Sequence, residues 1–198
     1  MDRKNKKLIF FLVAIHIGII TLSNFLVSIP FILYGYKITW AAFSFPFVVL
    51  STDLAVRLLG NKIAQKTISY SYPLAIILSI MIVYIEGNLL SVAVRIGIAS
   101  STAYALSVLI DIHAFQFIRK RYSTWWLAPS LSTVISNVID SYVFFSVAFL
   151  KSEDEYMAIN WIEIAGTQAV LKIIIGLIFF LPTYGILLNF LSKRLTKS

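Results

Sequence analysis

The chain has 198 residues, of which 59% are hydrophobic and only 13% are charged, and its mean hydropathy is +0.87. This composition is too apolar for a soluble domain of that length and is typical of a protein that crosses a membrane several times. The absence of cysteine excludes disulfides, thiolate metal sites and cysteine nucleophiles, and His16 and His113 occur in no metal-binding spacing. Neither a metal ion nor a cofactor is therefore expected.

The apolar runs predict an all-α, polytopic membrane protein, built as one domain over residues 1–198. The basic start of the chain leads into an apolar segment without a convincing cleavage site, so we interpret it as a retained first span rather than a signal peptide. In the fourth span, the small-residue run 97–103 predicts that another helix packs closely. Six transmembrane helices are expected, at about residues 8–31, 40–59, 67–84, 89–117, 127–149 and 162–190.

Positive charges are distributed unevenly between the two ends of the predicted spans. Only Lys37 and Lys151 lie on one side of the membrane, while Arg95 and Lys172 fall inside spans. Lysine and arginine concentrate on the cytoplasmic side of membrane proteins, so both termini are expected in the cytoplasm. The asymmetry explains the net charge of +8 without a nucleic-acid partner and leaves membrane lipid as the expected contact. The remaining basic residues, all on the other side, are Arg3, Lys4, Lys6, Lys7, Arg57, Lys62, Lys66, Arg119, Lys120, Arg121, Lys193, Arg194 and Lys197.

A strip of polar side chains interrupts the apolar run 127–149. Thr133, Ser136, Asn137 and Asp140 are offset by three, four and seven residues, which places them on one face of a helix. A carboxylate near the middle of a membrane costs roughly 2.5–3.5 kcal/mol on insertion scales, so it normally faces a bundle interior, a cavity or a partner. The strip indicates either a substrate or ion site, or a polar contact that only holds helices together.

Charged side chains on two other predicted spans fall at a depth similar to that of Asp140. With a helical rise of about 1.5 Å per residue, Arg95 lies about 9 Å and Lys172 about 15 Å below the outer ends of their spans. Buried charges must pair or meet water, which predicts a polar cavity that opens outward. A purely structural salt-bridge cluster is the alternative. The candidate substrate-binding residues are Asp140, Asn137, Arg95, Lys172, Asn24, Thr133 and Gln168.

Four residues in the inner half of the predicted bundle are candidates for coupling or gating. Asp53 and Arg57 are four residues apart, a spacing that suits an ion pair within one helix. We expect this pair to serve assembly or inner gating rather than ligand recognition. Asp111 and His113, on the fourth span, are candidate proton carriers. No nucleophile with an adjacent base is recognisable, so enzymatic activity is not expected.

Several motifs are distributed along nearly the whole chain. They are His16 to Pro30, Thr39-Trp-Ala-Ala-Phe-Ser-Phe-Pro46, Thr52-Asp-Leu-Ala-Val-Arg57, Arg95 with Ala103-Tyr-Ala105, Asp111-Ile-His-Ala-Phe115, Trp125-Trp-Leu-Ala-Pro129, Asn137 with Asp140, Lys172, and Phe179-Phe-Leu-Pro-Thr-Tyr-Gly185. Together they resemble the YhhQ family of queuosine-precursor transporters. The resemblance implies a six-helix fold similar to a vitamin-transporter substrate-binding subunit. It also implies uptake of 7-cyano-7-deazaguanine across the bacterial cytoplasmic (inner) membrane. One departure is Gln168, where we expect a carboxylate in some relatives.

The candidate residues suit the ligand that the resemblance implies. A deazaguanine presents adjacent N–H donors, for which a carboxylate such as Asp140 is a bidentate acceptor, and a ring carbonyl to which arginine, lysine or asparagine can donate. Its flat ring can stack on aromatic side chains, for which Phe43, Phe45 and Tyr142 are available. A small 7-deazapurine is thus the expected partner, and a homo-oligomer is compatible with the sequence.

Two other functions remain as alternatives. The chain could be the substrate-binding subunit of an ATP-driven uptake complex, for which Ala14 and Gly18 offer a surface of small residues, and co-purification with an energising module would distinguish this case. It could also be an ion channel or a purely structural membrane protein. A channel would show conductance without saturable uptake.

Overall fold

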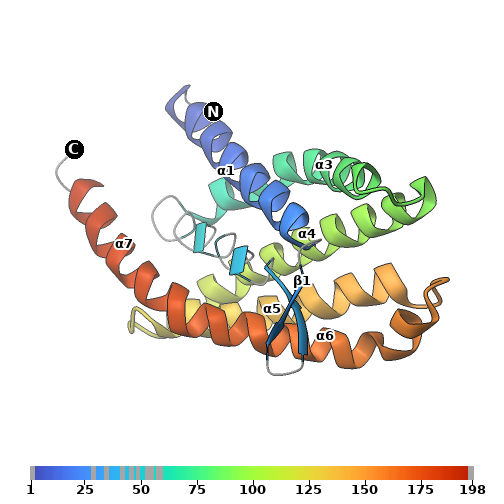
Figure 1. Cartoon of the computed structure of the whole chain (residues 1–198). Coiled ribbons are helices and arrows are strands. Elements are labelled where there is room, and N and C mark those ends of the chain that lie inside the picture. Colours follow the sequence, from blue (N-terminus) through green and yellow to red (C-terminus); the bar gives the residue numbers. More distant parts are fainter. Residues whose placement is uncertain are drawn as a thin grey trace.

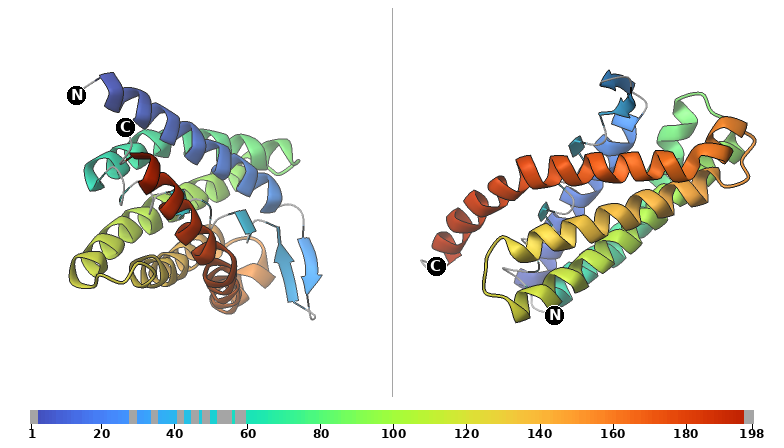
Figure 2. Two further views of the ribbon diagram at one scale, coloured as in Figure 1. Left: turned by 90° about the vertical axis from the view of Figure 1, so that its left-hand side faces the viewer. Right: turned by 90° about the horizontal axis from the view of Figure 1, so that it is seen from below.

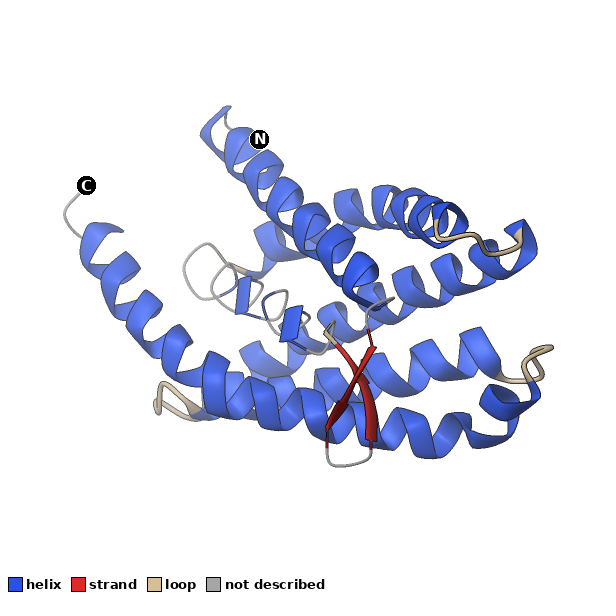
Figure 3. Ribbon diagram, viewed as in Figure 1, coloured by secondary structure: helices blue, strands red, loops and turns tan. Residues whose placement is uncertain are grey.

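Helices joined by turns and one β-hairpin make up most of the protein (Figure 1, Figure 3). The computed structural model describes residues 3–27, 30–33, 36–40, 43–44, 47, 50–51, 56 and 60–195. The helices are α1 (Arg3–Val27), α3 (Asn61–Ile85), α4 (Leu90–Arg121), α5 (Leu127–Phe149), α6 (Glu155–Ile175), the π-helical segment η1 (Gly176–Phe180) and α7 (Leu181–Leu195). The hairpin pairs β1 (Pro30–Leu33) with β2 (Tyr36–Thr39) in antiparallel fashion.

Two short connections turn the chain between long helices. Between α3 and α4, Gly87 adopts a φ of 92°, a left-handed conformation that glycine enters without steric cost. Between α5 and α6, the carboxylate of Asp154 accepts a hydrogen bond from the Met157 amide at 3.0 Å and caps α6. Because both connections are short, the helices that they join run antiparallel and pack side by side.

The helices pack largely in chain order: α1 on α3, α3 on α4, α4 on α5, and α5 on α6 (Figure 1). Seen from below, α5 lies between α4 and the continuous helix formed by α6, η1 and α7 (Figure 2). A Cβ atom added at Gly97 of α4 would lie 2.8 Å from the backbone nitrogen of Ile80 in α3. The prediction that the run 97–103 admits a close helix contact is therefore confirmed at Gly97.

A hydrophobic core joins α4 to the C-terminal helix. Phe115 of α4 and Tyr184 of α7 are fully buried, and their rings meet edge to face with centroids 6.5 Å apart. Trp125 packs on Gly185, where an added Cβ would lie 2.8 Å from the indole ring. After η1, α7 thus packs on residues that lie near the end of α4 and the start of α5.

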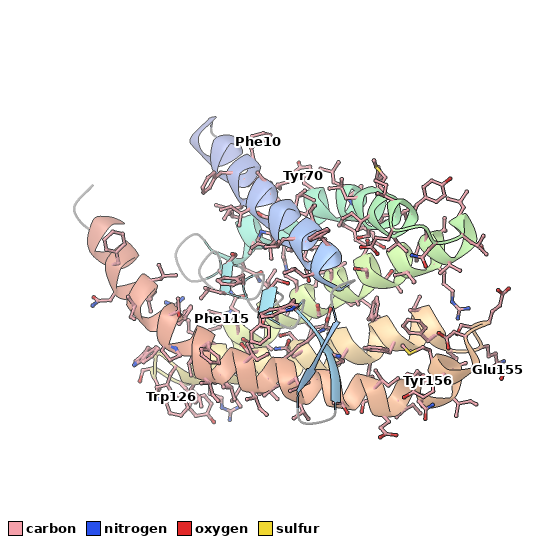
Figure 4. The ribbon with its side chains drawn as sticks, viewed as in Figure 1. Phe10, Tyr70, Phe115, Trp126, Glu155 and Tyr156 are labelled. Atoms are coloured by element: carbon pink, nitrogen blue, oxygen red, sulfur yellow. The ribbon has the colours of Figure 1, made fainter. Side chains whose placement is uncertain are left out.

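Apolar side chains also cover the outside of the bundle, as expected of a protein surrounded by lipid. Figure 4 shows Phe10, Tyr70 and Tyr156 at the periphery, and all three are exposed. Within the described ranges, four helical stretches are long and apolar enough to cross a membrane, and α1 adds a shorter apolar stretch, Ile9–Ser23. The four are Asn61–Ile85, Leu90–Arg121, Leu127–Phe149 and Glu155–Phe179. The chain is thus a multi-pass membrane protein.

The observed helices differ from the predicted spans mainly at their ends. The helix α5 has the predicted bounds 127–149, whereas α3 begins at Asn61 instead of residue 67 and α6 begins at Glu155 instead of residue 162. Hydropathy marks only the part of a helix inside the hydrocarbon, while the backbone hydrogen bonds continue into polar residues beyond it. The predicted sixth span, 162–190, contains η1 and part of α7.

Between α1 and α3 the structure has a β-hairpin where the sequence predicted the end of the first span and a loop. The first span was expected to run over residues 8–31, but α1 ends at Val27 and β1 begins at Pro30. The expected outer loop 34–39 includes strand β2. Most of the predicted second span, 40–59, lies outside the described residues, so six spans and their orientation remain a prediction.

Candidate functional site

An ion pair lies inside the bundle and joins α5 to α6. The Nζ of Lys172 is 2.7 Å from Oδ2 of Asp140, and the two side chains are only 14% and 7% exposed. From α4, Ser107 contributes its hydroxyl, 3.4 Å from Oδ1 of Asp140. The Ser107 hydroxyl has one proton to donate, and the Tyr104 carbonyl, at 3.1 Å, is a second and nearer acceptor for it. Oδ1 of Asp140 therefore keeps most of its capacity to accept hydrogen bonds. Three helices therefore meet at Asp140.

The helical period of α5 brings its polar strip into the bundle. Val138 and Ile135, on the opposite side of the helix, are exposed. The prediction of one apolar and one polar face is therefore confirmed, and the polar face is directed inward rather than toward lipid. Its buried members are Ser132, Thr133, Ser136, Asn137, Asp140 and Ser141.

The pairing of Asp140 with Lys172 explains how both charges are tolerated at this depth. Desolvating a lone charge costs several kcal/mol, and a partner with good geometry is needed to offset that cost. The separation of 2.7 Å is that of a charge-assisted hydrogen bond. The pair is neutral as a unit, yet the carboxylate keeps an oxygen that can accept donors from a bound molecule.

Two further polar atoms on the same face of α5 have no hydrogen-bond partner among the described residues. The Nδ2 of Asn137 donates to the Thr133 carbonyl at 2.8 Å, but its Oδ1 is buried without a donor. The hydroxyl of Ser141 is buried and equally without a partner. Buried polar groups are nearly always satisfied, so unsatisfied groups beside an ion pair indicate a place where a ligand or water can bind.

Small residues let α6 and η1 approach α5 on both sides of Lys172. A Cβ added at Gly176 would be 2.9 Å from Cγ2 of Thr133, and one at Gly166 would be 3.3 Å from the Tyr142 hydroxyl. These contacts set the antiparallel register, in which the part of α6 that includes Gln168 and Lys172 runs beside residues 137–141 of α5. Gln168 is partly buried, one turn before Lys172.

The structure places Arg95 away from Asp140, at the C-terminal end of α5. Its Nε donates to the Val147 carbonyl at 3.1 Å, and its Nη2 donates to the Leu150 carbonyl. These acceptors lie seven and ten residues beyond Asp140, about 10–15 Å along the helix axis. Of the two buried cations that were expected to accompany Asp140, the structure brings only Lys172 to it. A cation at a helix C-terminus satisfies free carbonyls and the helix dipole, so Arg95 ties α4 to α5.

Asp111 and His113 of α4 point in different directions, because side chains two positions apart on a helix are rotated by about 200° around its axis. Asp111 is fully buried, one turn beyond Ser107. His113 is exposed, and its Nδ1 lies 2.6 Å from the Leu109 carbonyl. A carbonyl can only accept, so Nδ1 carries a proton there, and in the neutral ring Nε2 can accept from the Gln65 amide at 3.3 Å.

The remaining sequence-based candidates are peripheral or lie outside the described residues. Phe43 is exposed and packs against Trp40, with ring centroids 5.6 Å apart. No three histidine or carboxylate side chains in the described part of the chain gather as they would around a metal ion. Phe45, Asp53, Arg57 and the side chain of Asn24 lie outside the described residues.

Sequence reasoning missed two serines that the structure places at the site. Ser107 was hidden in an apolar stretch of the fourth span, although it precedes Asp111 by one helical turn. Ser141 directly follows Asp140 and shares a face with Asn137, four residues earlier. A search for serines one turn from each buried carboxylate or amide would have found both.

Comparison with known proteins places this chain within a known family. The profile of a family described as "Putative vitamin uptake transporter" matches residues 39–187, a range that contains the ion pair. The chain is 42% identical to the "Queuosine precursor transporter" of Escherichia coli (strain K12) over 201 residues, covering 96% of this chain and 90% of the relative. It is 34% identical to the "Probable queuosine precursor transporter" of Haemophilus influenzae (strain ATCC 51907 / DSM 11121 / KW20 / Rd) over 217 residues, covering 98% and 92%. No solved structure matches the chain.

Proposed function

Since the chain belongs to the family of queuosine precursor transporters, we propose that it takes up 7-cyano-7-deazaguanine, a queuosine precursor, across the bacterial inner membrane. The family resemblance inferred from sequence motifs is confirmed, and the protein is a membrane transporter, not an enzyme. The nitrile-bearing ligand and the inner membrane are our proposals.

The observation that carries the proposed site is the buried pair of Asp140 and Lys172 beside two unsatisfied polar atoms. A 7-deazaguanine has a lactam and amino edge with adjacent N–H donors, which a carboxylate accepts in bidentate fashion. Oδ1 of Asp140 retains acceptor capacity, and its Oδ2 is oriented by Lys172. We assign the ligand's N–H edge to Asp140, and we propose that Lys172 holds that carboxylate in position.

Access to this site is proposed to come from the outer side of the membrane. Arg95 fastens α4 to the end of α5 and so positions the helix that carries Asp140. Gln168 lies one turn before Lys172 on α6, and Thr133 belongs to the buried polar face of α5, two turns before Asp140. Asp53 with Arg57, and Asp111 with His113, remain our candidates for inner gating or proton coupling. Phe43, Phe45 and Asn24 remain candidate ligand contacts.

Uptake of radiolabelled 7-cyano-7-deazaguanine tests the proposal directly. Cells that cannot synthesise the compound are compared with and without this protein, and queuosine in their transfer RNA is measured as a second readout. Saturable uptake that depends on the protein is expected. If cells with the protein in their membranes take up no more than cells without it, the substrate assignment fails.

A further inference from the structure

Asn137 presents an acceptor, not a donor, to the interior beside the ion pair. Its side chain is fully buried, and one end of the amide lies 2.8 Å from the Thr133 carbonyl. A carbonyl oxygen attracts only a donor, so the nitrogen must occupy that end, and flipping the amide would set two oxygens against each other. The oxygen at the other end is therefore fixed in direction, and it is buried without a donor.

Ser141 offers the second free group, one helical turn beyond Asn137. It is fully buried, and its hydroxyl has no hydrogen-bond partner. Serines in apolar helices usually donate to the carbonyl three or four residues earlier, as Ser136 does with Thr133 at 3.2 Å. The proton of Ser141 is not used in this way, so it is available to an acceptor on a bound molecule.

Asp140 lies between these two residues in sequence and on the same side of α5. Side chains three and four residues apart on a helix are neighbours, with Cβ atoms about 5–6 Å apart. The interior face of α5 thus offers a fixed acceptor on Asn137, a carboxylate on Asp140 and a hydroxyl donor on Ser141. Lys172 already donates to the carboxylate of Asp140. A donor for the Asn137 oxygen must therefore come from a bound molecule.

We propose that Asn137 and Ser141 determine which heterocycle the site accepts. The amino group of a 2-amino-4-oxo ring has two hydrogens. One joins the ring N–H at Asp140, and the other is donated to Oδ1 of Asn137. The ring carbonyl accepts a hydrogen bond from the Ser141 hydroxyl. This assignment rests on the proposed function and adds residues that select for guanine-type edges against edges of the adenine type, whose ring nitrogen presents an acceptor to a carboxylate.

The ligand itself supplies the sharpest test, because removing its amino group removes the hydrogens donated to Asp140 and to Asn137 and leaves the carbonyl in place. Unlabelled 7-cyano-7-deazaguanine and its 2-desamino analogue compete with labelled 7-cyano-7-deazaguanine for uptake by the unmodified protein. The analogue should need a concentration about tenfold or more higher for half-inhibition. Equal potency of the two compounds would overturn the role of Asn137 without any substitution in the protein.

Two variants locate the effect. Asn137→Leu should weaken the parent compound about tenfold and the analogue hardly at all, so that the ratio of their half-inhibiting concentrations falls. The part of the ratio that comes from the amino contact with Asp140 should remain. Ser141→Ala should weaken both compounds by a similar factor of several-fold, because both keep the carbonyl. Ser132→Ala is the matched control: this serine is also fully buried in α5, but its hydroxyl already donates to the Pro129 carbonyl at 3.4 Å. It should change neither value.

The outcomes separate this inference from the proposed function. Absence of uptake by the unmodified protein sinks the proposed substrate and the ligand contacts with it. Normal uptake combined with an Asn137→Leu variant that weakens parent and analogue equally sinks only the specificity role, since a purely structural residue would act on both alike. The amount of each variant in the membrane is measured alongside, and the comparison of the two compounds within one variant is independent of that amount.

Discussion

Asp140 and Lys172 neutralise each other inside the bundle, so the effect of changing either one depends on the other. Lys172→Met leaves a buried carboxylate without its cation and should lower the free energy of unfolding by roughly 3–5 kcal/mol. Adding Asp140→Asn removes the unpaired charge and should restore most of that loss. Unfolding of the purified protein in detergent measures both. A double variant as unstable as the single one would show that Lys172 acts through packing alone.

Asp140 also provides the test of ligand recognition at the level of one residue. Asp140→Ala removes both acceptor oxygens and leaves ligand donors unpaired, a cost of roughly 1–3 kcal/mol that corresponds to a loss of affinity of about tenfold or more. Asp140→Asn keeps one oxygen and should be milder. Uptake assays over a range of ligand concentrations distinguish the two variants. Undiminished uptake by well-expressed Asp140→Ala would remove Asp140 from the site.

At the scale of helices, glycine controls how closely α3 and α4 pack. In Gly97→Ala the new Cβ would lie 2.8 Å from the nitrogen and 3.0 Å from the Cα of Ile80, and a neighbouring backbone cannot move aside as a flexible side chain can. The variant should be destabilised by about 1–3 kcal/mol or more, as in other overpacked cores. The measurement is the unfolding temperature in detergent.

Gly18→Ala is the matched control for that prediction. Gly18 is also helical, but an added Cβ there would have no atom of the described residues within 4 Å. Alanine is favoured over glycine inside a helix by roughly 0.5–1 kcal/mol, so this variant should be neutral or slightly more stable. Equal destabilisation of both variants would mean that close packing at Gly97 is not the cause.

At the scale of the whole molecule, the basic clusters can be related to the ends of the bundle. Asn61, at the start of α3, donates its amide to Gln116, near the end of α4. Lys62 and the basic last turn of α4, residues 119–121, therefore lie at the same end, as expected if that end faces the cytoplasm. Lys151, in the turn after α5, lies at the other end.

This arrangement predicts opposite labelling of two engineered cysteines in a chain that has none of its own. Lys151→Cys should react with a membrane-impermeant maleimide applied outside the cell, whereas Lys197→Cys should not. A permeant maleimide should label both and serves as the control for reactivity. The reverse pattern would place both termini outside and invert the proposed direction of access to the site.

The sequence by itself determined the membrane character of the protein and the inward orientation of the polar strip on α5. Both follow from local properties: apolar content per residue and a helical period of about 3.6 residues. For the same reason the bounds of α5 were predicted at 127–149. Hydropathy placed the starts of α3 and α6 too late, because these helices begin in polar residues at Asn61 and Glu155. Hydropathy reports the surroundings of side chains and not the backbone hydrogen bonds.

Only the tertiary structure decided which cation pairs with Asp140. Arg95 and Lys172 were expected at comparable depths, but depth along a helix says nothing about rotation around its axis or about which neighbours it has. The fold turns Lys172 toward Asp140 and carries Arg95 to the carbonyls at the end of α5. Likewise, the direction of the Asn137 amide and the unpaired state of the Ser141 hydroxyl depend on three-dimensional contacts, which no spacing in the sequence records.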